Sequence, residues 1–273
     1  MRPELDRLNS KPKARRPRRY IVLSDNHGFV GRIFDLSIVG MYFDDYEEVA
    51  KYPDAQYVWA VNERTSLLTQ RVESLNHVGD LLWPKTPTAI ATLPMSAYEF
   101  CNFIQDAFLM RTVSILDCCC LLAVDVLELD IQPRQANIER IRRISGNHAC
   151  CDRLQAISDL QLDLRTERNV RFHRGEEEPL TDDDTTFKTV ALFTYRGQGM
   201  AGTDRFGRKI DLKRFYNVAI DRLRNKFRTN ARNLHVVLDD FYDTLSHEFE
   251  RRFRPKFRAD GSFGHKHGVF GKE

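Results

Sequence analysis

One long apolar helix constrains the fold of this chain more than any other sequence feature. Residues 96 to 129 carry apolar side chains at helical intervals from Phe100 to Val124, and the later half of the stretch is apolar on nearly every side. A helix that is apolar all round is buried at the centre of a bundle. The stretch therefore predicts a large helical core built around one central element.

The rest of the chain repeats the helical periodicity, interrupted by proline and glycine. The apolar positions predict a first helical element over residues 29–51, closed by Pro53, and a second over Gln56 to Trp83. Further helices are expected over 138–144, from Leu154 into the region before Gly175, over 186–195 and over 211–251. Strand-like alternation is scarce. The fold class indicated is all-α, a bundle of long antiparallel helices, roughly five to seven in number.

The two ends of the chain differ from this helical domain. Residues 1–19 are rich in arginine, lysine and proline, which predicts a disordered basic arm. The domain is expected over residues 20–253, and its first apolar run, 20–23, fits either a short strand or the lead-in to a helix. Residues 254–273 are expected to form a flexible tail. The 273 residues suffice for one large domain.

Composition and cysteine usage indicate a cytoplasmic protein. Hydrophobic residues make up 42% of the chain and charged residues 30%, with a net charge of +3. No window approaches the roughly 20 apolar residues of a membrane span, so no membrane association is expected. The six cysteines form no CxxC pair, and adjacent cysteines in apolar helices are typical of buried thiols in a reducing compartment.

One short stretch carries a candidate chemistry. Residues 165–175 read RTERNVRFHRG, in which Arg168, Asn169 and His173 form the pattern R-N-x-x-x-H. An arginine followed by a histidine at about this distance should occur by chance roughly three times in so arginine-rich a chain. Requiring asparagine after the arginine lowers that expectation to roughly 0.04. In its basic, helical context the pattern resembles the signature of HEPN-domain ribonucleases.

The resemblance implies a specific activity. HEPN ribonucleases are metal-independent endoribonucleases that need no cofactor and leave 2′,3′-cyclic phosphate and 5′-hydroxyl ends on RNA. They commonly act as homodimers with a composite active site, in phage defence or in toxin–antitoxin growth arrest, where an antitoxin or another defence protein is the partner. One departure is Gly175, which stands where some HEPN toxins carry tyrosine, and it weakens the resemblance to the toxin–antitoxin subgroup and to its mode of control by an antitoxin.

The side chains suit this activity. His173 could take the proton of an RNA 2′-hydroxyl or supply one to the leaving oxygen. Arg168 would stabilise charge on the phosphate, Asn169 would orient His173 or donate to the phosphate, and Arg171 and Arg174 would bind flanking phosphates of the RNA. On an ideal helix Asn169 and His173 share a face, whereas Arg168 lies about 100° away. A second copy of the chain would therefore complete the site.

A structural role for the same residues stays open. His173 could cap a helix end, and Arg168 could pair with Glu167, Asp163 or the acidic segment 176–184. That segment contains two acidic triplets, EEE and DDD, whose like charges we expect to resist packing. If the segment competes with RNA for the arginines, it would inhibit the site.

A metal-dependent alternative rests on four other fragments. SDNHG, GD, GNH and GHKH resemble, in the right order, the ligand motifs of calcineurin-like metallophosphoesterases, in which Asp, Asn and His hold two metal ions. The matching residues are Asp25, His27, Asp80, Asn147, His148, His265 and His267. Such ligands belong on loops of a β-sandwich, which the helical pattern disfavours. A third alternative is a non-catalytic helical module that binds RNA or a protein.

Overall fold

The computed structural model of the chain describes residues 26–84 and 89–267. The basic arm 1–19, the apolar run 20–23 and Asp25 lie outside the described residues. Within them every named element is a helix, and an isolated antiparallel bridge between Thr203 and Lys209 is the one sign of strand pairing. The all-α prediction is confirmed, and the described residues contain no sheet that could carry a β-sandwich metal site.

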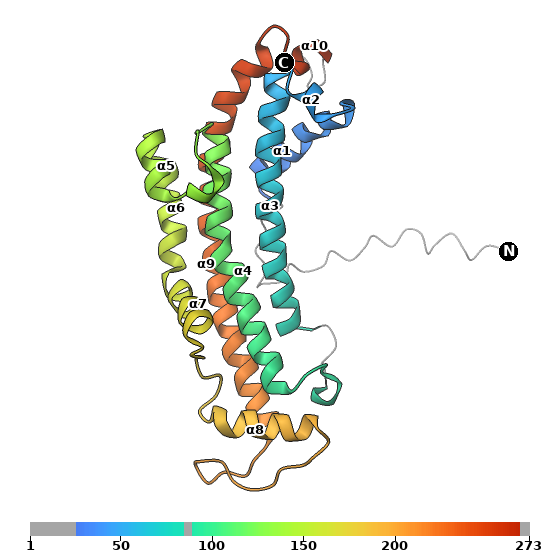
Figure 1. Cartoon of the computed structure of the whole chain (residues 1–273), viewed down its shortest axis with the longest axis vertical. Coiled ribbons are helices and arrows are strands. Elements are labelled where there is room, and N and C mark those ends of the chain that lie inside the picture. The colour runs from blue at the N-terminus through green and yellow to red at the C-terminus, as the bar shows by residue number, and fades with distance from the viewer. Residues whose placement is uncertain (1–25, 85–88, 268–273) are drawn as a thin grey trace, which may run out of the picture.

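Three long helices form the centre of the molecule: α3 (Pro53–Leu82), α4 (Ala97–Val126) and α9 (Leu212–Arg258), each in contact with the other two. The 47 residues of α9 span about 70 Å and reach from one end of the bundle to the other (Figure 1). Helix α4 corresponds to the long apolar stretch and occupies the central position expected for it. Its neighbour α3 runs antiparallel to both α4 and α9, as expected for antiparallel helices, whereas α4 and α9 run parallel to each other (Figure 1).

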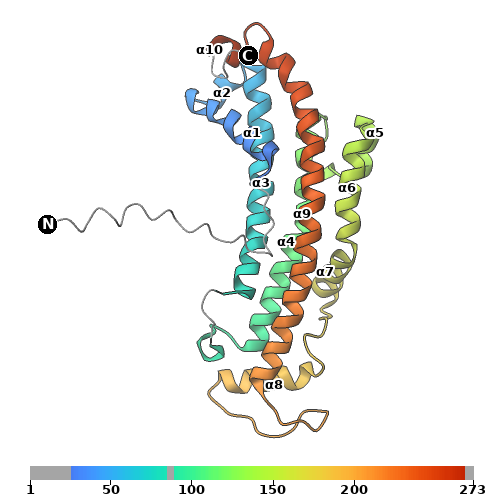
Figure 2. The same ribbon diagram turned by 180° about the vertical axis from the view of Figure 1, so that it is seen from behind.

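The parallel direction of α9 follows from the segment that precedes it. After α4 the chain returns along the bundle through α5 (Ile138–Ser145), α6 (His148–Leu160) and α7 (Leu162–Arg174), which form a second layer. Figure 2 shows this layer beside α9, and α8 (Asp184–Tyr195) crosses the lower end of the bundle. The chain therefore starts α9 at the end where α4 also starts.

Small elements close the upper end of the bundle. Helix α1 (Gly28–Ser37) packs on α3 and α9, and η1 (Ile38–Tyr42) and α2 (Tyr46–Val49) lead from it to α3. Near the C-terminus, α10 (Phe263–His267) also contacts α3 and α9. The short 3₁₀ helices η2 (Ile90–Thr92) and η3 (Pro133–Gln135) lie in the connections before and after α4.

The segment expected to be a flexible tail is ordered as far as His267. Helix α9 continues to Arg258, and the side chain of Phe263 is buried. The Asp54 carboxylate on α3 accepts hydrogen bonds from the amides of Phe263 and Gly264 at 2.9 and 2.8 Å. These contacts hold α10 against the bundle. Residues 268–273 of the expected tail lie outside the described residues.

Local signals explain most helix ends. Ser96 and Glu99 form a reciprocal capping box that begins α4. Gly146 ends α5 in the left-handed conformation, at φ 60°. The expectation that Pro53 closes the first element is wrong, because Pro53 is the first residue of α3. A proline there sacrifices no hydrogen bond, since the amides of a first helical turn have no partner within the helix.

The cysteines are buried thiols, as expected. All six are free, and five are buried, with Cys118 partly exposed. Burial raises the pKa of Cys101, Cys120 and Cys150 to about 12, which keeps these thiols protonated. The expectation that no window is apolar enough for a membrane span is wrong for α4, which is long and apolar enough to cross a bilayer, although 61% of its most apolar window is buried inside the protein. A buried core helix meets the same criterion, so α4 is weak evidence for a membrane span.

Candidate functional site on helix α7

A break before α7 sets the direction of the motif helix. The single helix expected from Leu154 toward Gly175 is interrupted at Gln161, which lies between α6 and α7. The Gln161 side chain is fully buried and donates from Nε2 to the carbonyl oxygen of Thr112 on α4 at 2.8 Å. This contact turns the chain so that α7 packs against α4.

The inner face of α7 holds Arg171, which was expected to bind RNA. Its side chain is only 4% exposed. The guanidinium donates to the carboxylate of Asp106 and, at 3.1 Å, to the side-chain oxygen of Asn102, both on α4. Glu177 adds an ion pair at 3.8 Å. Arg171 therefore attaches α7 to α4, and its burial and its partners correct the RNA-binding role predicted for it.

The first acidic triplet is also engaged in structural contacts. Glu177 accepts a hydrogen bond from the Tyr98 hydroxyl at 3.0 Å. Glu178 pairs with two cations of α9, Lys226 at 2.8 Å and Arg222 at 3.0 Å. Lys226 also pairs with Glu167 on α7. The cations of α9 therefore hold α7 and the segment after it against the bundle. The like charges of the first acidic triplet do not keep this segment unpacked, contrary to the expectation from the sequence.

The outer face of α7 carries Asn169 and His173, both exposed. The two residues are four apart and share one side of the helix, as predicted. Beside them is an open hollow of about 370 Å³, lined by Thr166, Asn169, Val170, His173 and Arg174. An amide, an imidazole and a guanidinium thus lie on one accessible surface. Among the described residues, no hydrogen bond or ion pair engages the His173 imidazole.

The end of α7 is capped by glycine and not by histidine. Gly175 adopts the left-handed conformation at φ 70°, and its amide donates to the carbonyl oxygen of Arg171 at 3.1 Å. Glycine reaches this conformation without strain. The proposed structural role of His173 as a cap is therefore taken by Gly175, which leaves His173 directed to the surface.

Arg168 does not line the hollow. It lies about 100° round the helix from Asn169 and is partly buried on the flank of α7. Its Nε atom is buried without a hydrogen-bond partner in the described part of the chain. The alternative pairing of Arg168 with Glu167 is not formed, since Glu167 binds Lys226 and Gln105 instead. Within one chain, the cation that shares the hollow with His173 is Arg174.

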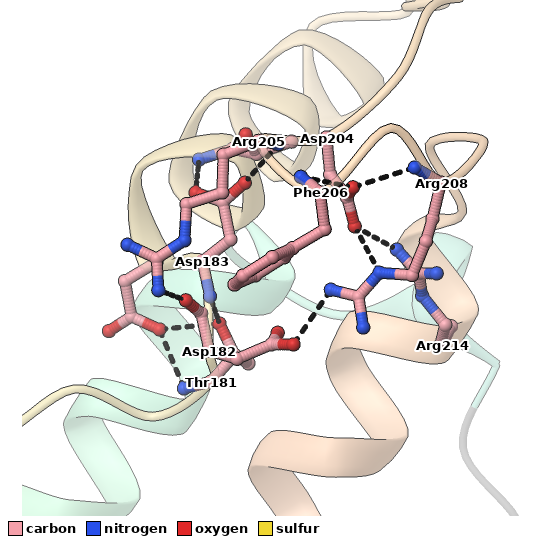
Figure 3. Close-up of polar contacts among 10 residues, drawn as sticks. Thr181, Asp182, Asp183, Asp204, Arg205, Phe206, Arg208 and Arg214 are labelled. Atoms are coloured by element: carbon pink, nitrogen blue, oxygen red, sulfur yellow. Dashed lines mark hydrogen bonds and ion pairs between the residues drawn. The ribbon is translucent and has the colours of Figure 1, made fainter.

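A second polar network lies at the lower end of the bundle, where the glycine-rich segment 196–211 joins α8 to α9 (Figure 3). The fully buried carboxylate of Asp204 accepts hydrogen bonds from the backbone amides of Phe206 and Arg208, both at 2.9 Å. It also pairs with the guanidinium groups of Arg208 and Arg214 at 2.7 and 2.8 Å. Burial alone would raise the pKa of Asp204, but these donors lower it to about 2.

The second acidic triplet is part of the same network. Asp182 forms an ion pair with Arg208 at 2.7 Å. Asp183 accepts a hydrogen bond from the Arg205 amide at 3.0 Å and also caps the start of α8. Asp184 accepts from the amides of residues 180 and 181. Figure 3 shows Asp182 and Asp183 close to Arg205 and Arg208 of the segment after α8. The expectation that this triplet resists packing is wrong, because each carboxylate has its own donors.

The residues of the metal-dependent alternative are dispersed. His27 and Asn147 cap the starts of α1 and α6, Asp80 lies on α3, His148 begins α6 and His265 lies on α10. Over the residues that the structure describes, no three His, Cys, Asp or Glu side chains gather as metal ligands would. Asp25 and the side chain of His267 lie outside that part.

Sequence reasoning missed two features around α7, one on its outer face and one on its inner face. Thr166 and Val170 line the hollow, and their spacing from His173 was the available signal, because residues three, four and seven apart share a helical face. Asp106, the carboxylate that holds Arg171, carried no local signal, since it lies 65 residues away.

Comparisons with known proteins add no relative. No protein-family model, curated protein or solved structure matches this chain. The HEPN resemblance therefore depends on Arg168, Asn169 and His173 and on their helical context.

Proposed function

We propose that the outer face of α7 is the active site of a metal-independent endoribonuclease of HEPN type. The observation that carries the proposal is the position of His173. Its imidazole is exposed beside an open hollow that also presents the Arg174 guanidinium and the Asn169 amide. Proton transfer to RNA needs an accessible imidazole with a cation nearby, and this surface offers both.

The proposed reaction is an internal transfer at one phosphodiester. The RNA 2′-oxygen attacks phosphorus and gives its proton to a base, while the bond from phosphorus to the 5′-oxygen breaks and that oxygen receives a proton. An imidazole can perform either proton transfer near neutral pH. Arg174 would stabilise the charge on the non-bridging oxygens, and Asn169 would orient His173 or donate to the phosphate. The products are a 2′,3′-cyclic phosphate and a 5′-hydroxyl.

Arg168 enters this scheme through a homodimer. Because it lies off the hollow of its own chain, its guanidinium would reach the phosphate bound at the His173 of a second copy. Arg174 would contact the reacting phosphate within its own chain and the flanking RNA phosphates, whereas Arg171 is buried against α4 and does not bind RNA. A helical endoribonuclease of this type would act in phage defence or growth arrest in the cytoplasm, with a defence or antitoxin protein as a further partner.

RNA cleavage in excess chelator tests the proposal. We expect wild-type protein to cleave single-stranded RNA in EDTA, and His173→Ala to lower the rate by about 10²- to 10⁴-fold, the usual contribution of a general acid or base. His77→Ala is the matched control, because His77 is also exposed on a helix and also follows an arginine, Arg71, at a similar distance. RNA binding without cleavage would favour the non-catalytic module. Cleavage that is abolished by EDTA would favour the metal-dependent alternative.

Mixing two inactive variants tests the composite site. A dimer of Arg168→Ala and His173→Ala subunits retains one site with both residues intact if the two come from different chains. We expect the mixture to regain up to about a quarter of wild-type activity, because about half of the dimers are mixed and each has one of two sites. If both residues act within one chain, mixing restores nothing.

A further inference from the structure

We propose that a cavity at the lower end of the bundle binds a fatty carboxylate or a closely similar anionic amphiphile. The cavity has a volume of about 640 Å³ and lies between the end of α3, the segment around η2, the start of α4 and the first turns of α9. Small-molecule sites of proteins typically have volumes of about 300–1,000 Å³. It is separate from the hollow on α7 and shares no lining residue with it.

The walls of the cavity are mostly apolar. Leu81 and Leu82 come from α3, Ile90 from η2, Phe100 from α4 and Ile220 from α9. Of these side chains, Leu81 is 41% exposed, although the same helix buries most of its other apolar residues. An apolar chain placed here would cover surface that is now in contact with water, which favours binding. The walls therefore favour a ligand with an aliphatic body.

The charged residues of the lining are all cations. Lys213 and Arg224 lie on one face of α9 with Asn217 between them, and none of the described residues that line the cavity is a carboxylate. Two acids lie near these cations in the chain: Asp211 caps α9 by accepting hydrogen bonds from the amides of Lys213 and Arg214, and Asp221 pairs with Arg224 at 3.1 Å. Lys213 also lies in the first turn of α9, where the helix dipole favours an anion. The lining around Lys213 is therefore complementary to a negatively charged head group.

The two cations differ in availability. Arg224 donates to the carbonyl oxygen of Leu82 at 2.9 Å and to Asp221 at 3.1 Å, and it lies over the ring of Trp83. In the described part of the chain, no ion pair engages the exposed ammonium of Lys213. The carboxylate is therefore expected at Lys213. Lys213 and Arg224 are 11 positions apart and therefore about 16 Å apart along α9, which gives an aliphatic tail room to run from Lys213 toward Ile220.

Calorimetric titration of the full chain with dodecanoate tests this proposal, with dodecyltrimethylammonium as a ligand of equal tail and opposite charge. We expect saturable binding of dodecanoate and at least tenfold weaker binding of the cationic amphiphile. Lys213→Glu should weaken dodecanoate binding about tenfold or more, as the loss of a charged hydrogen bond does. Lys209→Glu is the matched control, because this exposed lysine lies outside the cavity and makes the same charge change.

A variant that fills the cavity separates the tail from the head group. Ala91→Trp places a large ring at an exposed lining position, so it should abolish dodecanoate binding while leaving the thermal unfolding temperature of the free protein unchanged. The proposal is overturned if dodecanoate does not bind, if the cationic amphiphile binds as tightly, or if Lys213→Glu and Ala91→Trp bind dodecanoate as wild type does. RNA cleavage by wild-type protein is measured separately, and its presence or absence does not change these outcomes.

Discussion

The central helices and the α7 side of the molecule are held together by different forces. Helices α3, α4 and α9 join through a continuous apolar core, whereas α7 buries only Leu164 and Arg171 and is held mainly by ion pairs and hydrogen bonds. Burial of apolar surface involves no titrating group and is not screened by salt, whereas exposed and half-exposed charge pairs are sensitive to pH and are weakened by salt. The bundle can therefore persist under conditions that shift the helix carrying the candidate site.

The largest effect is expected in the core. Phe241 is fully buried on α9, so Phe241→Ala should lower the free energy of unfolding by about 3–5 kcal/mol through lost burial and a residual cavity. Chemical denaturation measures this change. Val236 on the same helix is 57% exposed, and Val236→Ala should change the free energy of unfolding by less than about 0.5 kcal/mol. Equal effects of the two substitutions would show that α9 does not bury the face described.

A smaller effect is expected where α7 joins α4. Asp106→Ala would leave the buried guanidinium of Arg171 without its closest carboxylate, and we expect a loss of about 2 kcal/mol in the free energy of unfolding, since Asp106 is itself 40% exposed. Asp163→Ala is the control, because Asp163 is an exposed acid in the first turn of α7. If Asp106→Ala behaves like this control, ion pairing does not hold α7, and the contrast between the two regions fails.

The smallest effect is local to the loop network and depends on pH. The pKa of Asp204 in the folded protein, about 2, lies below the ordinary aspartate value of about 3.9. Its carboxylate therefore favours the folded loop above about pH 4, and this contribution is lost as the pH falls toward 2. We expect hydrogen-exchange protection of the Phe206 and Arg208 amides to fall over that range while the amides of α4 stay protected.

Asp204→Asn separates this carboxylate from general acid effects. The variant should show reduced protection of the two loop amides already at pH 6 and little further decrease on acidification. Asp44→Asn, at an exposed site on the opposite end of the bundle, should follow the wild-type profile. A wild-type profile in Asp204→Asn would mean that Asp204 does not hold the loop.

The sequence predicted the elements that depend on local patterns and missed those that depend on distant partners. The long helices and the buried cysteines follow from apolar spacing, and the shared face of Asn169 and His173 follows from helical geometry. The break at Gln161 could not be predicted, because the partner of its buried side chain is a carbonyl group 49 residues away on α4. A proline is compatible with either the end of one helix or the first turn of the next. The prediction for Pro53 is wrong because the local pattern does not distinguish these two positions.

The candidate site shows the same division. The R-N-x-x-x-H pattern identifies three residues, but only the fold decides which side of α7 faces the bundle. Leu164 is the one buried apolar side chain of that helix, and this is too little apolar periodicity to orient its arginines. The sequence therefore predicts an RNA-binding role for Arg171, which in fact faces α4. For Arg168 the sequence gives only its angle of about 100° from Asn169 around the helix, and not its distance from the hollow.

The unbroken length of α9 limits how this protein can change size. Its first turns carry the network around Asp204 and its last turns contact α10, so both ends of the bundle depend on the register of one helix. One inserted residue would rotate everything beyond it by about 100° and disrupt one end while sparing the other. Seven inserted residues restore the facing to within about 20°. Viable length variants should therefore gain or lose whole heptads, matched in α3, α4 and α9.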